Sequence, residues 1–370
     1  MEYLRNTWYV AMWSKDLKPG DIIGRTFLNE QLVLFRTADG KVSALSDICP
    51  HRFAPLSKGT LVDGCKVKCA YHGLEFDATG ACVKNPHGQE RIPAAAKVPM
   101  FPCVEKHSAI WLWMGEKEAD PSLIPDFSML GENSGFEVSR RDWLKMEANY
   151  ELVVDNLMDL SHTAFLHDGI LGNSETINAQ TKLENVGNTV KVRRLAVNVP
   201  VPGFFDLMYK RDGRRVDYWA DIRWDQPACL MNDTGVTEPG APRSEGTGVY
   251  GMHFITPETD ATCWYHFAAV RQNPVYWGEP IDTEVRQKIA DLRRFAFEEQ
   301  DQVIIRAQQQ TILRMKPGMR PVALETDVGL ERYKRILYAQ IQVEQQERAA
   351  REASVVTARA EAKSIAIQRA

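Results

Sequence analysis

The chain has 370 residues, of which 44% are hydrophobic and 25% are charged, and its formal net charge is −4 at pH 7. This composition is typical of a soluble globular protein of two domains and argues against a disordered chain. The mild charge and the lack of a long basic run favour neither nucleic acid nor an anionic membrane as a partner. Because the N-terminus lacks a signal segment and no run approaches about 18 apolar residues, we expect a cytoplasmic protein.

The first third of the chain has the pattern of an all-β domain. From Trp8 to Met114, short β-rich runs such as Gln31–Arg36 and Ala109–Met114 alternate with turn signals such as Asp39-Gly40. A stretch rich in loop residues follows, at positions 115–135. We therefore predict a first domain over residues 1–118, followed by a second domain that starts in this loop-rich stretch.

Two short motifs in the first domain carry four metal-binding side chains. Cys49-Pro50-His51 is followed, after seventeen intervening residues, by Cys69-Ala70-Tyr71-His72. Two cysteines on one iron and two histidines on the other are the ligand set of a Rieske [2Fe–2S] cluster, which transfers single electrons. A structural zinc ion could use the same four side chains, but the strand-like residues around two tight loops favour the Rieske cluster.

The second domain, residues 119–335, mixes helix and strand signals. Helical patterns cover Tyr150–His167 and Asp282–Leu313, and strand-like runs include Thr189–Val197 and Thr262–Arg271. This mixture predicts an α+β domain in which helices flank an antiparallel sheet. Residues 336–370 lack Gly and Pro and predict a helical extension, which is either solvated along its length or a strap between subunits.

A second metal site is indicated where two carboxylates and two histidines occur within Asp155–His167. On a regular helix His162 and His167 would point about 140° apart, so we predict that the helix breaks near Phe165. Two histidines and one carboxylate on one face hold a mononuclear Fe(II) that activates O2. We predict Asp301 as the carboxylate ligand, with Glu298 as the local alternative.

Taken alone, His162 and His167 would more often be ordinary surface or core histidines. The Rieske motif reverses that interpretation for a chemical reason. Activation of O2 requires two electrons, and a mononuclear iron stores only one of them. A nearby one-electron cluster supplies the other, so the two predicted centres are complementary.

In combination, these motifs resemble the Rieske non-haem iron oxygenases, in particular the oxygenase components of the vanillate O-demethylase and dicamba monooxygenase group. The resemblance covers roughly residues 1–335. It rests on the two cluster motifs and on the segments Arg5–Val10, Asn85–Gly88, Asp155–Leu160 and His253–Thr259. It implies a catalytic domain of the helix-grip, START-like type and a homotrimer in which the cluster of one subunit feeds the iron of its neighbour.

The same resemblance implies a bridging role for Asp159. A carboxylate at this position could accept one N–H from His162 and another from the partner subunit's His72, which would give the electron a short bonded route. A carboxylate that makes only a local contact on the helix is the alternative. Asn232 and His253 match positions that hydrogen-bond the substrate in dicamba-type enzymes. Leu292 stands where those enzymes carry a ring-stacking tryptophan, so the particular substrate stays open.

We predict an O2-dependent O-demethylase that hydroxylates the methoxy group of an aromatic acid and releases formaldehyde. Hydroxylation of an aryl methyl or another C–H bond is the first alternative, and a Rieske electron carrier is the second. We expect electrons to come from NAD(P)H through a separate flavin- or ferredoxin-type reductase. This expectation assumes that the chain has no dinucleotide-binding fingerprint of its own. Positive side chains near the cluster loops could dock that reductase, namely Arg52, Lys58, Lys66 and Lys68.

Overall fold

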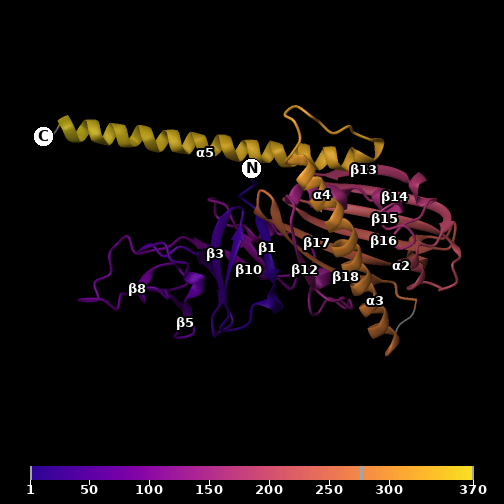
Figure 1. Ribbon diagram of the computed structural model, residues 1–370, viewed down its shortest axis with the longest axis horizontal. Coiled ribbons are helices and arrows are strands. Elements are labelled where there is room, and N and C mark those ends of the chain that lie inside the picture. Colours follow the sequence, from indigo (N-terminus) through magenta and orange to yellow (C-terminus); the bar gives the residue numbers. More distant parts are fainter. Residues whose placement is uncertain (1, 276–277, 369–370) are drawn as a thin grey trace.

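A computed structural model describes residues 2–275 and 278–368 (Figure 1). The N-terminal part is built from short strands: β1 (Trp8–Trp13), β2 (Ile22–Phe27), β3 (Glu30–Arg36), β4 (Val42–Ser46), β5 (Thr60–Val62), β6 (Lys66–Lys68), β7 (Glu75–Phe76), β8 (Cys82–Lys84), β9 (Met100–Phe101), β10 (Cys103–Lys106) and β11 (Ala109–Trp113). They form three antiparallel sheets, with the orders β1-β11-β10, β2-β3-β4-β9 and β5-β6-β7-β8. The predicted all-β domain is confirmed.

The C-terminal part is an antiparallel sheet flanked by helices. Its strands follow the order β12-β18-β17-β16-β15-β14-β13. Their bounds are β12 (Asp142–Met146), β13 (Gln180–Val186), β14 (Thr189–Pro200), β15 (Arg215–Asp225), β16 (Cys229–Thr237), β17 (Thr247–Thr259) and β18 (Thr262–Gln272). The helices are α1 (Tyr150–Met158), α2 (Gly203–Asp206), α3 (Ile281–Phe295), α4 (Gln302–Ile312) and α5 (Val328–Gln368). Helices α3 and α4 cross one face of the sheet (Figure 1), so the predicted α+β arrangement is also confirmed.

Strand β17 is buried on both faces, and its alternating side chains serve two different environments. Met252 and Phe254 point into an aromatic cluster with the tryptophans of β1 and β11. Gly251 and His253 face the opposite way and line a pocket beneath the helices. Because successive side chains of a strand point to opposite faces, one strand joins the N-terminal domain on one side and builds the pocket on the other.

The two domains share a continuous hydrophobic core. Phe254 of β17 contacts the rings of Trp13 and Trp111, with centroid distances of 5.8 and 5.3 Å. Edge-to-face aromatic pairs of this kind add to the free energy of apolar burial. A shared core makes independent motion of the two domains costly, because separating them would expose these large rings to water.

Helix α5 starts before the predicted extension and continues as a single helix to Gln368. Tyr333, Leu337 and Ile341 recur every fourth residue and are buried, which fixes the first turns of α5 on the sheet. The carboxylate of Glu344 then accepts the backbone N–H groups of Arg5 and Asn6, at 2.7 and 2.8 Å. In the described parts of the chain, every helix is too short or too polar to cross a bilayer.

Candidate metal centres and substrate pocket

The two cluster loops have the same local backbone structure. The N–H of Cys49 donates to the carbonyl of Ala54 (3.0 Å), and the N–H of Phe53 donates back to the carbonyl of Cys49 (2.9 Å). Cys69 makes the same pair of bonds with Leu74 and Gly73, at 2.8 and 2.9 Å. The fourth residue after each cysteine has positive φ, 60° at Phe53 and 72° at Gly73, which closes each loop tightly. The same turn therefore presents each Cys-His pair.

The four side chains of these loops separate into a buried pair and an accessible pair. Cys49 and Cys69 are each 2% exposed, whereas His51 lies at the surface and His72 is half-buried. The two imidazole rings lie edge to face with centroids 4.4 Å apart. His87 Nε2 lies 2.8 Å from the carbonyl oxygen of His72 and so supports the second loop from outside. The arrangement buries the sulfur end and leaves the histidine end open to a partner.

The spacing of these four side chains also favours one of the two metal interpretations. A tetrahedral zinc ion would bring all four donor atoms within about 4 Å of one another. In the described residues, only His162, His167 and Asp301 form a group of three or more potential ligands with all donor atoms within 4.8 Å. No three of the donor atoms of Cys49, His51, Cys69 and His72 therefore all lie within 4.8 Å of one another. This spacing fits a cluster of two irons, with one pair of ligands on each.

The first histidine of the second site stands just beyond the end of α1. The helix ends at Met158, because Asp159 leaves the helical region (φ −104°, ψ 91°) and its carboxylate accepts the N–H of Ser161 at 2.9 Å. His162 then begins a 3₁₀ turn. The prediction of a break was right in kind but wrong in position, because the helix ends at Met158 rather than near Phe165.

Hydrogen bonds to both imidazoles turn the same ring atom toward the metal site. His162 Nδ1 contacts the backbone carbonyl oxygen of Asp159, which only accepts, so this nitrogen carries the proton. The predicted hydrogen bond from His162 to the carboxylate of Asp159 is therefore wrong, because the acceptor is the backbone carbonyl oxygen of Asp159. His167 Nδ1 donates to Gln300 Oε1 at 2.8 Å, and Gln300 Nε2 donates to the carbonyl of Leu166 at 2.8 Å. Both Nε2 lone pairs are left free for a metal.

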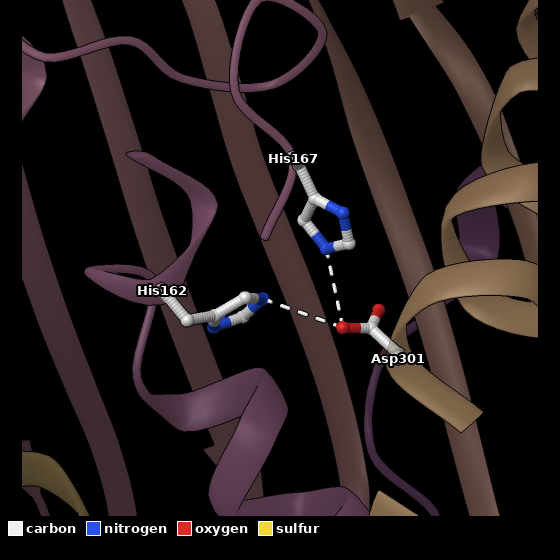
Figure 2. A group of neighbouring side chains, drawn as sticks. All are labelled: His162, His167 and Asp301. Carbon is white, nitrogen blue, oxygen red and sulfur yellow. Dashed lines mark ion pairs between the residues drawn. The ribbon is translucent and has the colours of Figure 1, made fainter. Parts of the chain in front are cut away.

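Asp301 completes the group from the opposite side (Figure 2). Its Oδ1 atom lies 3.6 Å from His162 Nε2 and 3.2 Å from His167 Nε2, and it accepts an N–H from Asn156 at 3.0 Å. The carboxylate ends a π-helical turn, Ala296–Asp301, that separates α3 from α4. Such turns add one residue to a helix and are frequent at functional sites, because the extra residue changes the direction in which a side chain points.

Glu298, the alternative ligand, points elsewhere. Its carboxylate pairs with Arg294 at 2.6 Å, and its side chain is 39% exposed. Asp301 is 3% exposed and faces the two histidines. Burial lowers the pKa of His162. Burial also acts to lower the pKa of His167, but the hydrogen bond with Asp301, the charge of Asp301 and the hydrogen bond with Gln300 together outweigh it, so the pKa of His167 is raised. Two neutral imidazoles and one carboxylate are a donor set that fits a divalent iron.

The metal ligands open into a pocket between the sheet and the helices. Asn232 and His253 line it, as do the apolar side chains of Leu157, Leu160, Leu171, Phe204, Phe205, Val249 and Phe297. Asn232 Oδ1 and His253 Nε2 are buried and have no hydrogen-bond partner in the described structure, whereas His253 Nδ1 lies 2.6 Å from the hydroxyl of Tyr265. Apolar walls with a few convergent polar groups are typical of small-molecule sites.

Three further residues of the site were not predicted, namely Asn156, Gln300 and Arg293. The first two hold metal ligands, and Arg293 lines the pocket. Asn156 and Gln300 stand next to predicted residues in sequence, but nothing in the sequence reveals which way an amide points. Arg293 carries a clearer signal, because it follows Ile289 by four residues and precedes Phe297 by four. A charged side chain on the apolar stripe of a helix is unusual unless it has a function.

The spacing Gly-x-Gly-x-x-Gly does occur, from Gly246 to Gly251, contrary to the assumption behind the reductase prediction. A dinucleotide-binding loop of this spacing connects a strand to the N-terminus of a helix. Here the glycines lie at the start of β17, where Gly248 pairs with Gly235 of β16 and with Gln272 of β18. The backbone amides are engaged in the sheet, so this segment is not a phosphate-binding loop.

Comparisons with known proteins agree with this geometry. The model of the Rieske [2Fe–2S] domain matches residues 7–102, and that of the vanillate O-demethylase oxygenase C-terminal domain matches residues 146–342. The oxygenase component of dicamba O-demethylase from Stenotrophomonas maltophilia is 37% identical over 343 residues, 90% of this chain and 97% of that protein. The iron–sulfur subunit of the toluene-4-sulfonate monooxygenase system of Comamonas testosteroni is 34% identical over 338 residues, 89% of this chain and 94% of that protein.

A solved structure matches over both domains. The crystal structure of dicamba monooxygenase bound to 3,6-dichlorosalicylic acid covers 93% of this chain and 99% of its own, with a TM-score of 0.87 and 34% sequence identity. The predicted family and the predicted centres, a Rieske [2Fe–2S] cluster and a non-haem iron that uses O2, are confirmed. With both domains matched along nearly the whole chain, the protein belongs to the Rieske non-haem iron oxygenases, in the group of the vanillate and dicamba O-demethylase oxygenase components.

Proposed function

We propose that this oxygenase O-demethylates a methoxylated aromatic acid and releases formaldehyde. The observation that carries the proposal is that His162, His167 and Asp301 open into the same pocket as Asn232 and His253. The apolar walls suit an aromatic ring, and the buried polar atoms suit its acidic substituent. Relatives named for the O-demethylation of dicamba and vanillate support the same reaction class.

Two sets of side chains hold the metals in this proposal. Cys49, His51, Cys69 and His72 bind the [2Fe–2S] cluster. His162, His167 and Asp301 bind a mononuclear Fe(II), which activates O2 when it is present. Gln300 and the carbonyl of Asp159 fix the tautomers of the two histidines, and Asn156 fixes the rotamer of Asp301.

The overall reaction balances with O2 and two electrons. Ar–O–CH3, O2, two electrons and two protons give ArOH, formaldehyde and water. One oxygen atom enters the C–H bond of the methyl group, and the resulting hemiacetal loses formaldehyde as the O–CH2 bond breaks and the phenol oxygen takes the proton. The apolar side chains Leu157, Leu160 and Phe297 exclude bulk water from the reacting methyl group.

The electrons reach the site through a homotrimer in this proposal. The β5–β8 sheet that carries the cluster loops lies at the far end of the molecule from the β12–β18 sheet (Figure 1). Apolar side chains stand exposed at both places: Phe53 and Tyr71 beside the cluster are 77% and 60% exposed, and Phe165 beside the iron site is 71% exposed. Exposed apolar groups of this size mark surfaces that a second molecule covers. The cluster of one subunit would then face the iron site of the next.

Asp159 is the proposed bridge between the two centres. Its backbone carbonyl already contacts His162, and its carboxylate is partly exposed, with Arg194 4.0 Å away. Its Oδ1 atom accepts the N–H of Ser161, which leaves Oδ2 to accept the ring N–H of the partner subunit's His72, and the electron would pass through Asp159 to His162.

A separate reductase supplies the electrons in this proposal, since the Gly246–Gly251 segment is part of the sheet. Arg52, Lys58 and Lys68 are exposed near the cluster, whereas Lys66 pairs with Asp63 at 2.8 Å. Lys66 is thus the weakest of the four predicted docking residues. Charge reversal at Lys68 should raise the apparent KM for the reductase more than charge reversal at Lys66.

Hydroxylation of an aryl methyl group is the second candidate reaction. A relative that is named for toluene-4-sulfonate, which carries such a methyl group, favours it. A protein that only carries electrons needs no second group of metal ligands beside a pocket. The electron-carrier alternative therefore does not explain why His162, His167 and Asp301 lie together.

Metal content and product identity test the proposal together. The purified protein should contain about three irons and two acid-labile sulfides per chain. With NADH and a surrogate reductase, methoxybenzoates should release formaldehyde, and methylbenzoates serve as the control substrates. Asp301→Asn should lose the mononuclear iron and all turnover, whereas the matched variant Glu298→Gln should keep both. Alcohols from methylbenzoates without formaldehyde from methoxybenzoates would establish the second reaction, and two irons without turnover would contradict both.

A further inference from the structure

A buried arginine faces the substrate pocket without a partner for its charge. Arg293, on α3, is 6% exposed, and its Nη2 atom has no hydrogen-bond partner. In the described part of the chain it forms no salt bridge. The next residue, Arg294, provides the contrast, because it pairs with Asp142 at 2.8 Å and with Glu298 at 2.6 Å outside the pocket. The charge of Arg293 is thus the uncompensated one.

Aromatic rings hold this guanidinium in place. Its central carbon lies 5.4 Å from the ring centroid of Phe297 and 5.7 Å from that of Phe267. Cation–π contacts of this kind return part of the free energy lost when the cation leaves water, but they leave the N–H donors unsatisfied. A buried cation whose N–H donors are unsatisfied is stabilised by an anion whose oxygen atoms accept those N–H groups.

Gly251 keeps the surroundings of the Arg293 guanidinium free of a side chain that would crowd it. A β-carbon at this position would stand 3.3 Å from Arg293 Nη2, 3.2 Å from His253 Nε2 and 3.5 Å from the β-carbon of Asn232. Asn232 and Gly251 are direct partners across β16 and β17. The missing side chain therefore keeps free a cradle that is bounded by three polar residues, and the buried nitrogen atoms Arg293 Nη2 and His253 Nε2 lack hydrogen-bond partners there.

We propose that Arg293 binds the anionic group of the substrate in this cradle, together with the ring N–H at His253 Nε2 and an Nδ2 N–H of Asn232, and so makes the enzyme specific for acids. The proposal rests on the proposed function, because it takes this pocket as the substrate site. The planar guanidinium can donate two parallel N–H bonds to a carboxylate or a sulfonate. Tyr265, 2.6 Å from His253 Nδ1, holds the imidazole so that Nε2 faces the same space.

Equilibrium binding to the iron-loaded enzyme under anaerobic conditions tests the proposal. The probes are 3-methoxybenzoate, 3-methoxybenzenesulfonate and the uncharged 3-methoxybenzamide, each measured by calorimetry. Arg293→Gln should weaken at least one of the two acids about 100-fold, since a buried ion pair loses one partner, and should change the affinity for the amide less than about threefold. The acid that binds more tightly to the unmodified enzyme identifies the preferred oxyanion.

Three further variants separate anion binding from a purely structural role. Arg293→Lys keeps the charge and should restore most of the acid affinity. Arg294→Gln removes the neighbouring, already paired charge and should leave all three affinities unchanged. Gly251→Ala should weaken both acids, because its methyl group fills the cradle. The EPR signal of the reduced cluster and the thermal unfolding midpoint report that each variant is folded.

Two results would overturn the proposal. The first is an unchanged affinity for both acids in Arg293→Gln. The second is an equal loss of affinity for acid and amide, which would make Arg293 a structural residue. Failure of the proposed function is distinguishable: if acids bind through Arg293 but no methoxybenzoate releases formaldehyde, the demethylase reaction fails alone. If formaldehyde is released and Arg293→Gln leaves the KM for the acid unchanged, the anion cradle fails alone.

Discussion

The hydrogen bond from His167 to Gln300 predicts a large and local effect on metal affinity. Gln300 Oε1 accepts the Nδ1 proton of His167 at 2.8 Å, and His167 is 1% exposed, so water cannot replace the amide. Gln300→Leu keeps the volume but leaves a buried N–H unpaired, at a cost of about 1–3 kcal/mol. Because the bond also selects the tautomer that presents Nε2, that loss should appear as metal binding about 10- to 100-fold weaker.

The assay is an anaerobic titration of protein that has lost its mononuclear iron but keeps the cluster. Fe(II) or Co(II) is added, and the EPR signal of the cluster serves as the internal reference for folded protein. Gln302→Leu is the matched control, because the Gln302 amide donates only a long bond, 3.3 Å, to the carbonyl of Lys145 at the surface. If Gln300→Leu binds metal within twofold of the control, the hydrogen bond does not orient His167 and the argument is refuted.

Three other predictions concern electron transfer, acid stability and the N-terminal contact. Asp159→Asn should keep both metal centres yet nearly abolish product formation, because a neutral amide is a weaker acceptor than a carboxylate for the ring N–H of the partner subunit's His72; normal turnover would exclude the bridge. His266 is fully buried, and burial lowers its pKa to about 3, so the unfolded chain binds the extra proton and stability falls as pH decreases from about 6.5. Between pH 7 and pH 5, the free energy of unfolding measured in urea should fall by about 2 kcal/mol less in His266→Leu than in the unmodified protein. An equal fall in both proteins would contradict this prediction. Glu344→Ala removes the acceptor of two backbone N–H groups and should lower the free energy of unfolding by about 1–3 kcal/mol, whereas Gln345→Ala should leave it nearly unchanged.

The sequence predicted the architecture well because the relevant signals are local. Turn residues and β-rich runs marked the first domain, and Asp282–Leu313 closely matches the segment that α3, the π-helical turn and α4 occupy. The end of α1 was misplaced, since the decisive interaction is the bond of the Asp159 carboxylate to the N–H of Ser161. Asp, Leu, Ser and His all occur in helices, so composition alone does not reveal this turn.

The metal ligands were more predictable than their supports. A pattern of cysteines, histidines and one carboxylate carries its own chemistry, and His162, His167 and Asp301 do lie in one group. The orientation of each imidazole depends on partners such as Gln300, whose amide is 133 residues away from His167 in sequence. The role of Arg293 on α3 depends on Gly251, a glycine on strand β17. Such contacts arise only when the sheet and the helices pack, and no local pattern encodes them.

The contact of Glu344 with Arg5 and Asn6 has a consequence for the order of events during translation. The two partners are separated by 339 and 338 residues, and Arg348 also reaches Glu2 at 3.0 Å. Arg5 and Asn6, just before β1, therefore leave the ribosome long before the Glu344 carboxylate that accepts their N–H groups is synthesised. The first residues to be synthesised reach their final hydrogen bonds among the last, so a nascent chain that stops before residue 344 carries an incompletely anchored amino terminus, however well its cluster domain has folded.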